Sequence, residues 1–209
     1  MFSFTKRPEQ TIDLAGHIYH VNLAFNRVIK AFGVLDDESL SDIEKIDQCF
    51  HIFSVDLQID DLATKGSIVA NLFTYINATP YGNFDDGAEP VEESEPVESI
   101  ADYDFEQDAA AIYASFMSDY HIDLNNELDR MHWDVFKALF DNLGEKTPIN
   151  RIRQIRNDDL SNYKDNAQQA GVIAEAQMYY QLDKNKADDS FSGNASAIFD
   201  GLFADSESF

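Results

Sequence analysis

The stretch that decides the fold runs from residue 103 to residue 160, YDFEQDAAAIYASFMSDYHIDLNNELDRMHWDVFKALFDNLGEKTPINRIRQIRNDDL. Within it, apolar residues recur three or four positions apart, the spacing that brings side chains to one face of an α-helix. The pattern predicts one helix around residues 112–120 and a second, with a broader apolar face, over residues 124–143. We therefore expect a compact helical region.

Start and stop signals separate these predicted helices. Asp123 is a typical N-cap for the second helix, and Gly144 is typical of the position just past a helix end. Thr147 followed by Pro148 predicts an N-cap and a first-turn proline, so a third, short helix is expected to begin there. Three isoleucines line this helix: Ile149, Ile152 and Ile155.

The rest of the chain predicts a short β-hairpin and further helices. Residues 11–22 contain two brief apolar runs around Gly16, which can supply the positive φ of a tight turn. Ser41 with Glu44 forms a capping box that starts one helix. Other helices are predicted at residues 23–32 (ended by Gly33), 60–77 and 166–182. The predicted fold class is therefore mainly α, a small helical domain with a short N-terminal hairpin.

Two acidic segments lack this periodicity. Residues 79–101 predict a disordered acidic linker, or alternatively an acidic arm that becomes ordered on a basic partner. Residues 184–209 predict a mobile acidic tail, or alternatively a tail whose Ile198, Leu202 and Phe203 form a short amphipathic turn against a partner. The expected organisation is a hairpin with helices at 1–78, the linker at 79–101, a helical region at 102–183 and the tail at 184–209.

The charge of the chain restricts its partners. The formal net charge is −24 and the isoelectric point is near 4.2, so phosphate backbones and anionic lipid headgroups would repel the protein. We expect neither nucleic acid nor a membrane as a partner. The single cysteine, Cys49, excludes an intramolecular disulfide and lies in an apolar helical run, so a core position is expected. The N-terminus lacks signal-peptide character, which favours the cytoplasm.

No combination of residues predicts catalysis. None of the five histidines has the spacing of a metal-binding pair with a third ligand nearby. Neighbouring acids are frequent because acids are frequent, and phosphate-binding, dinucleotide-binding, serine-hydrolase and zinc-protease motifs are absent from the sequence. We expect no enzyme activity, no catalytic or metal-binding residues and no cofactor.

Aromatic residues at helical spacing form a stripe in the decisive stretch. At this spacing most of them are expected to lie in the core. If the helices leave a groove, the same side chains offer a hydrophobic surface to a partner helix. We therefore treat them as candidate partner-binding residues: Tyr113, Phe116, Tyr120, Trp133, Phe136 and Phe140.

A group of cations stands out in this acidic chain: Lys146, Arg151, Arg153, Arg156 and Lys164. One interpretation is internal neutralisation, in which they pair with the abundant carboxylates. The other is a docking face for an acidic partner segment or for another copy of the chain. On the second interpretation, Arg151, Arg153 and Arg156 are candidate partner-binding residues.

The same stretch resembles a known family. The residues that carry the resemblance are YDFEQD at 103–108, IYASF at 112–116, YHIDL at 120–124, MHWDVFKALF at 131–140, and Arg156 with Asp159 and Leu160. Together they resemble the tail-assembly proteins of long-tailed phages of Gram-positive hosts, which are encoded between the major tail protein and the tape-measure protein. Relative to the family pattern, a glycine, a leucine, a tryptophan and an arginine are replaced by His121, Met131, Asp134 and Lys137.

The resemblance implies a tail-assembly chaperone. Such a protein binds the long, helical, aggregation-prone tape-measure protein, keeps it soluble, helps recruit tail-tube subunits and leaves before the virion is complete. The implied partners are the tape-measure protein and the major tail (tube) protein, with the upstream tail-assembly protein or a second copy of the chain as further candidates. The implied location is the host cell cytoplasm during assembly and not the mature virion. A permanent structural component of the tail or neck is the alternative, followed by an enzyme or host-directed effector.

Overall fold

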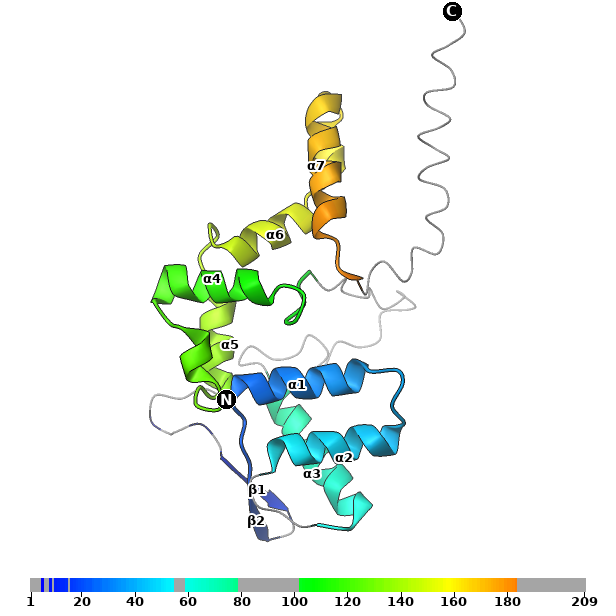
Figure 1. The fold of residues 1–209 in the computed structure, drawn as a ribbon, viewed down its shortest axis with the longest axis vertical. Coiled ribbons are helices and arrows are strands. Elements are labelled where there is room, and N and C mark those ends of the chain that lie inside the picture. The colour runs from blue at the N-terminus through cyan, green and yellow to red at the C-terminus, as the bar shows by residue number, and fades with distance from the viewer. Residues whose placement is uncertain are drawn as a thin grey trace, which may run out of the picture. The chain divides into compact units, whose positions relative to one another are not determined.

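The computed structural model describes residues 5, 8, 10–14, 16–54, 59–78 and 102–183. The predictions of a disordered linker at 79–101 and of a mobile tail at 184–209 lie outside the described residues. Within the described residues the fold is mainly helical with a short N-terminal hairpin, as the sequence predicted (Figure 1).

The chain divides into two compact units. Unit 1 comprises Met1–Glu98 and Phe116–Gly144, and unit 2 comprises Ser99–Ser115 and Glu145–Phe209. The helical region predicted at 102–183 therefore contributes to both units. Helix α4 (Ala109–Tyr120) begins in unit 2 and ends in unit 1.

The N-terminal hairpin of unit 1 consists of β1 (Thr11–Leu14) and β2 (His17–His20). The strands pair antiparallel, with Thr11 opposite His20. Gly16 has a φ of 82°, a left-handed conformation that glycine adopts without steric cost. The side chain of Asp13 accepts the Gly16 N–H at 2.9 Å and so stabilises the turn.

Three helices follow the hairpin in unit 1: α1 (Phe25–Asp36), α2 (Asp42–Phe53) and α3 (Leu62–Asn77). Helices α1 and α2 lie side by side and antiparallel, and α2 packs against α3 (Figure 1). Helix α2 starts with the predicted capping box, in which the N–H and hydroxyl of Ser41 donate to the Glu44 carboxylate at 2.9 and 2.6 Å. These hydrogen bonds hold the pKa of Glu44 below its ordinary value.

The predicted end of the first helix at Gly33 is wrong, because α1 continues through Gly33 to Asp36. A glycine inside a helix costs about 1 kcal/mol relative to alanine. The buried face of α1 offsets this cost, since Phe25, Val28 and Ala31 are all buried in unit 1. Tertiary packing therefore overrides the local stop signal.

The predicted single helix over 124–143 is also wrong, because the backbone breaks at Asp129. The segment forms a 3₁₀ turn, η1 (Leu124–Glu127), and a separate helix, α5 (Trp133–Asp141). Asp129 has a φ of 58°, which a right-handed helix cannot contain. Its N–H donates to the side-chain oxygen of Asn26 on α1 at 2.9 Å. A contact distant in sequence thus interrupts the helix.

The break changes which residues cap the helices. The predicted N-cap Asp123 caps only η1, where its carboxylate accepts the Asn125 N–H at 3.0 Å. His132 caps α5 instead, because its Nδ1 accepts the Asp134 N–H at 3.1 Å. The sequence contained no standard N-cap at position 132 that would have revealed this start.

Unit 2 contains the first part of α4 together with α6 (Pro148–Arg156), a 3₁₀ turn η2 (Leu160–Tyr163) and α7 (Ala167–Tyr180). Helix α6 starts with Pro148 in its first turn, as predicted, and packs against α7. The hydroxyl of Ser115 accepts the Ile149 N–H at 3.1 Å, and both residues are buried. This hydrogen bond joins the start of α6 to α4.

Cys49 lies in the core of unit 1, as predicted. Its side chain is fully buried, with Sγ 3.8 Å from the carbonyl oxygen of Ala31. Burial raises the pKa of the thiol to about 11, so the reactive thiolate is not formed near neutral pH.

Candidate functional site

Four members of the aromatic stripe lie in the core of unit 1. Phe136 is at the centre of this cluster, with its ring stacked on Phe116 at 5.1 Å and on Phe25 at 4.8 Å between ring centroids. Trp133 and Phe140 stack on the same ring at 5.7 and 5.9 Å. All of these side chains are at most 6% exposed. A partner could touch them only if unit 1 opened.

The two tyrosines of the stripe are placed differently. Tyr113 is half-buried and belongs to unit 2, so the structure does not bring all six aromatic residues into one unit. Tyr120 is half-buried in unit 1, where its hydroxyl lies 3.0 and 2.9 Å from the carbonyl oxygens of Leu139 and Asn142. Burial, with the nearby charge of Asp119, raises the pKa of Tyr120. Its hydroxyl fastens the end of α5 to α4.

Arg156 forms a buried clamp in unit 2. Its guanidinium donates to both carboxylate oxygens of Asp108, at 2.7 and 2.8 Å. It also donates to the carbonyl oxygens of Asp102 at 2.9 Å and Tyr180 at 2.6 Å. The Arg156 and Asp108 side chains are 8% and 5% exposed. This geometry ties the segment before α4 and the end of α7 to α6.

The other two candidate arginines differ from each other. Arg153 donates to the carboxylate of Asp102 at 2.9 Å and lies over the ring of Tyr103, 5.3 Å from its centroid. Arg151 is exposed, and its side chain forms no ion pair among the described residues. Internal neutralisation therefore accounts for Arg153 and Arg156, whereas Arg151 is available on the surface. Whether any of the three binds a partner stays a prediction.

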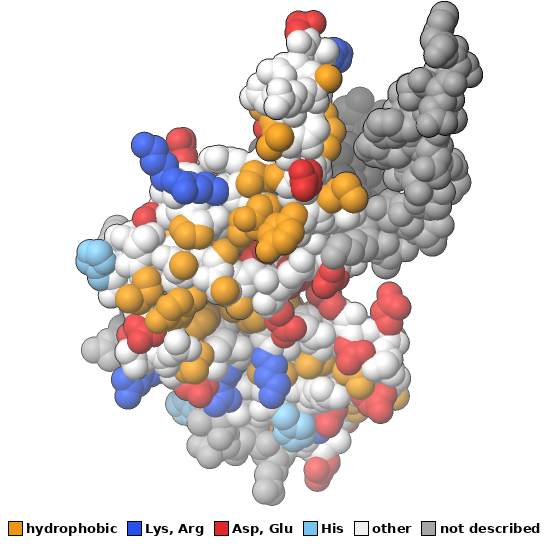
Figure 2. Space-filling view, turned by 45° about the horizontal axis from the view of Figure 1, so that its top comes forward, with side chains coloured by type: hydrophobic (Ala, Val, Ile, Leu, Met, Phe, Trp, Pro, Cys, Tyr) orange, Lys and Arg blue, Asp and Glu red, His pale blue; other side chains and the backbone are white. Residues whose placement is uncertain are grey.

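The surface feature that sequence reasoning missed is the outer face of α7. Val172, Met178 and Tyr179 are 62%, 74% and 81% exposed. Figure 2 shows hydrophobic side chains at the surface of this helix. We call these three side chains, with Glu175 between them, the α7 face. Large apolar groups gathered on one exposed helix face are typical of a protein-binding surface.

Polar contacts attach the inner side of α7 to the rest of unit 2. Gln177 donates to the carbonyl oxygens of Ile155 at 3.0 Å and Asp158 at 2.7 Å, and Arg156 holds the carbonyl of Tyr180. Polar groups thus attach α7 to α6, and no α7 side chain is fully buried. The signal available in the sequence was that apolar residues occur all around this helix, more than one buried face requires.

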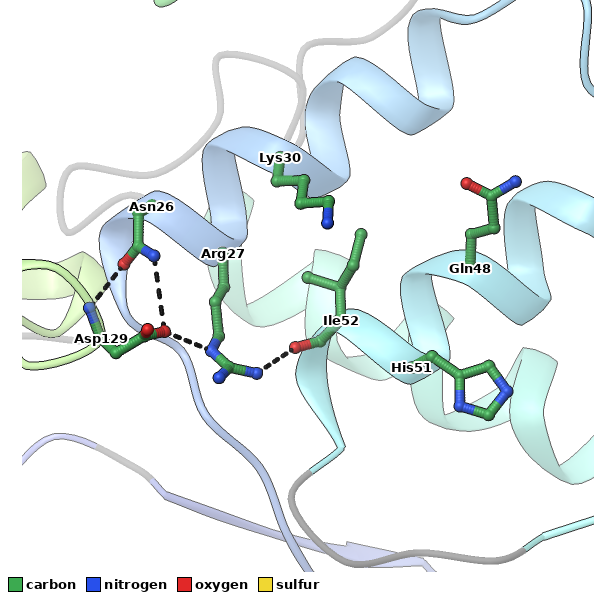
Figure 3. A pocket seen from close by; sticks show the side chains of 7 residues that line it. All are labelled: Asn26, Arg27, Lys30, Gln48, His51, Ile52 and Asp129. Carbon is green, nitrogen blue, oxygen red and sulfur yellow. Dashed lines mark hydrogen bonds and ion pairs between the residues drawn. The ribbon is translucent and has the colours of Figure 1, made fainter.

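Unit 1 has an open pocket of about 500 Å³ between α1 and α2. Figure 3 shows the Arg27 guanidinium between Asp129, to which its Nε donates at 2.6 Å, and the carbonyl of Ile52 at 2.9 Å. Lys30 and His51 also line the pocket. The ion pair cancels the charge of Arg27, so the lining of the pocket is only weakly cationic. The same ion pair helps to hold the backbone at Asp129, where the helix is interrupted.

The pair in this pocket makes the stability of unit 1 depend on pH. The hydrogen bond from Arg27, followed by that from Asn26, holds the pKa of Asp129 below its ordinary value of 3.8. A lowered pKa in the folded state means that Asp129 stabilises the fold above its unfolded pKa. This contribution is lost as the pH falls through the folded value.

We expect Asp129→Asn to lower the urea midpoint of unit 1 near neutral pH and to match the wild type once the pH is well below 3.8. Asparagine tolerates the left-handed backbone at this position, so the substitution adds no strain. Fluorescence of the single tryptophan, Trp133, reports the unfolding of unit 1. Glu38→Gln, in an exposed turn, should match the wild type throughout. An Asp129→Asn difference of equal size at both pH values would contradict the ion-pair explanation.

Among the described residues, no group of three or more His, Cys, Asp and Glu side chains is arranged to hold a metal ion. None of the helices in this part of the chain combines the length and apolar character that a bilayer crossing requires. The sites that the structure does present are a packed aromatic core, a buried ion pair, a weakly cationic pocket and an exposed apolar helix face.

Comparison with known proteins agrees with a phage origin. No curated protein sequence and no solved structure matched the chain. One family model matched residues 7–182, and its description is "Bacteriophage Gp15 protein". The match includes both units and every described element from the hairpin to α7. The chain therefore belongs to the bacteriophage Gp15 protein family.

Proposed function

We propose that this phage protein is a tail-assembly chaperone. It binds the tape-measure protein, keeps it soluble in the host cell cytoplasm, helps recruit major tail (tube) subunits and leaves before the virion is complete. In this role it acts by binding alone, without catalysis. The observation that carries the proposal is the α7 face, a large exposed apolar surface on a member of a phage protein family.

The α7 face suits a helical partner. Val172 and Tyr179 are two helical turns apart and lie on the same side of α7. Met178 is about 100° farther around the helix axis, at the edge of the same exposed side. An amphipathic partner helix would bury its own apolar side against them. Methionine adapts its shape to different neighbours, which favours binding to many sites along a long, repetitive helical protein.

The charge of the chain complements this surface. A net charge of −24 keeps the complex in solution, because copies that coat an aggregation-prone protein repel one another. Glu175 is the one acidic residue among the three apolar side chains, and it lies about one helical turn from each of them. The binding is expected to be reversible, since tube subunits must displace the chaperone.

Co-expression with the tape-measure protein of the same phage tests the proposal. The wild-type chain should bring the tape-measure protein into the soluble fraction and co-purify with it. We expect Val172→Gln/Met178→Gln to weaken binding of the tape-measure protein about five- to thirtyfold, since two exposed anchors are worth about 1–2 kcal/mol together. Ile43→Gln is the matched control, because Ile43 is a 60% exposed apolar residue on α2.

The possible results of this experiment distinguish an error in the proposed binding surface from an error in the proposed chaperone role. If the double variant still solubilises the tape-measure protein, the chaperone role stands but the α7 face is not its surface. If the tape-measure protein remains insoluble while the chain is found in purified particles, the protein is a permanent component of the tail or neck.

A further inference from the structure

We propose that the open pocket of unit 1 binds an acidic side chain of a partner helix. The pocket has a volume of about 500 Å³ and lies between α1 and α2, with Asp129 at one end (Figure 3). The ligand it would take is the carboxylate of a glutamate that a helical protein segment presents. This inference goes beyond the proposed function, because it concerns a different unit from the α7 face and a partner of different chemistry.

Lys30 supplies a positive charge that the fold does not use. Its side chain is exposed on α1 and forms no hydrogen bond or ion pair among the described residues. The chain has 39 acidic residues against 15 lysines and arginines, yet none of the described carboxylates lies within ion-pair distance of this ammonium group. Arg27 precedes Lys30 by three positions, and Figure 3 shows both side chains extending from α1 toward the end of α2.

Arg27 adds donors that its internal contacts do not use. Its Nε donates to Asp129 at 2.6 Å, and its Nη1 donates to the carbonyl oxygen of Ile52 at 2.9 Å. The other terminal nitrogen, Nη2, donates to none of the described residues, and the side chain is 32% exposed. Because two contacts already fix the guanidinium, a ligand would bind its remaining N–H groups at little further cost in conformational entropy.

The charges that line the pocket favour a single carboxylate. Asp129 offsets the charge of Arg27, and the His51 imidazole lies 3.6 Å from the carboxylate of Asp47. About one positive charge therefore remains without a counter-charge in the lining, that of Lys30. One acidic side chain would neutralise it, whereas a nucleic acid would bring further phosphates against an acidic protein.

The size and position of the pocket favour a helical partner over a free anion. A volume of about 500 Å³ is larger than one carboxylate needs, and Ile52 lines it beside the polar groups. A helix lying along α1 and α2 could place one side chain in this space, where the Gln48 amide can also donate a hydrogen bond. At physiological ionic strength the Debye length is about 8 Å, so more distant acids of the chain repel such a side chain only weakly.

A titration of the full-length chain with a model peptide tests the proposal. The probe is a helical peptide of alanine and glutamine with blocked termini and one central glutamate, and the control peptide has glutamine at that position. In nuclear magnetic resonance spectra, the glutamate peptide should shift the Arg27 Nε–H and Gln48 side-chain amide signals until the site is saturated. The control peptide should leave both signals unchanged. Inorganic phosphate should bind more weakly than the glutamate peptide.

Variants locate the binding in the pocket. Lys30→Gln should weaken binding of the glutamate peptide about three- to fivefold, as expected for one partly exposed ion pair. The fold should be unaffected, because the Lys30 side chain is exposed. Lys30→Arg keeps the charge and should keep the wild-type affinity. Lys146→Gln makes the same change at an exposed position in unit 2, and it should match the wild type.

Three results would overturn the proposal. Equal binding of the two peptides would show that the carboxylate is not recognised. Equal losses from Lys30→Gln and Lys146→Gln would show that binding lies outside the pocket. Phosphate binding as tight as that of the glutamate peptide would show a general anion site instead of one for a helix. Because no tape-measure protein is present, each of these results is distinct from failure of the chaperone role.

Discussion

Replacing Phe136 with alanine is expected to lower the free energy of unfolding of unit 1 by about 3–5 kcal/mol. The ring is 1% exposed and lies between the rings of Phe25 and Phe116, in nearly parallel stacking at 4.8 and 5.1 Å. It therefore joins α1, α4 and α5. Its removal would leave a cavity that three separate elements would have to close, and so the loss should be at the upper end for a core residue.

Urea unfolding followed by Trp133 fluorescence measures this loss, because Trp133 lies in unit 1. The matched control is Ile43→Ala, an exposed helical position in the same unit, which should change the free energy of unfolding by less than about 0.5 kcal/mol. A loss below about 1 kcal/mol for Phe136→Ala would contradict the core position. A folded Phe136→Ala protein that no longer bound the tape-measure protein would favour the partner-binding interpretation of the stripe.

Arg156→Met is expected to destabilise unit 2 by about 3–5 kcal/mol, because it leaves the buried Asp108 carboxylate without its counter-charge. It also leaves the carbonyl oxygens of Asp102 and Tyr180 without the guanidinium donor. Methionine has a similar length, so lost packing should contribute little. The effect should be confined to unit 2, since every one of these partners belongs to it.

Hydrogen exchange of α6 measures this effect, with an expected acceleration of about 100-fold or more. Arg151→Met is the matched control, because Arg151 is an exposed arginine on the same helix and its side chain has no ion pair among the described residues. The control should exchange at the wild-type rate. Equal effects of the two substitutions would show that burial of the Arg156–Asp108 pair is not important for stability.

Local signals predicted most of the elements but not all of their ends. The capping box at Ser41, the turn at Gly16 and the start at Pro148 depend on neighbouring residues, and all three were predicted correctly. The helix end at Gly33 and the unbroken helix through Asp129 were wrong. Both errors arise where contacts between distant segments, the buried face of α1 and the Asn26–Asp129 hydrogen bond, outweigh the local preference.

The candidate site was less predictable than the fold. Helical spacing predicted that most of the aromatic stripe lies in the core, and four of its six residues do. The spacing could not tell a packed core from a groove, because both require apolar residues on one face. Likewise, Arg151, Arg153 and Arg156 look equivalent in the sequence. Their surroundings differ because only Arg156 faces a buried acid, 48 residues away in the chain.

The sequence by itself determined the helical class, the hairpin, the acidic charge and membership of a phage protein family. Helical periodicity, capping and composition are local properties, and they can be read directly from neighbouring residues. Only the tertiary structure decided which apolar residues are buried and which remain on the surface. Polar contacts from Gln177 and Arg156 attach one side of α7 to unit 2 and leave Met178 and Tyr179 in solvent. Exposure depends on which segments meet in space, and that is a property of the folded chain.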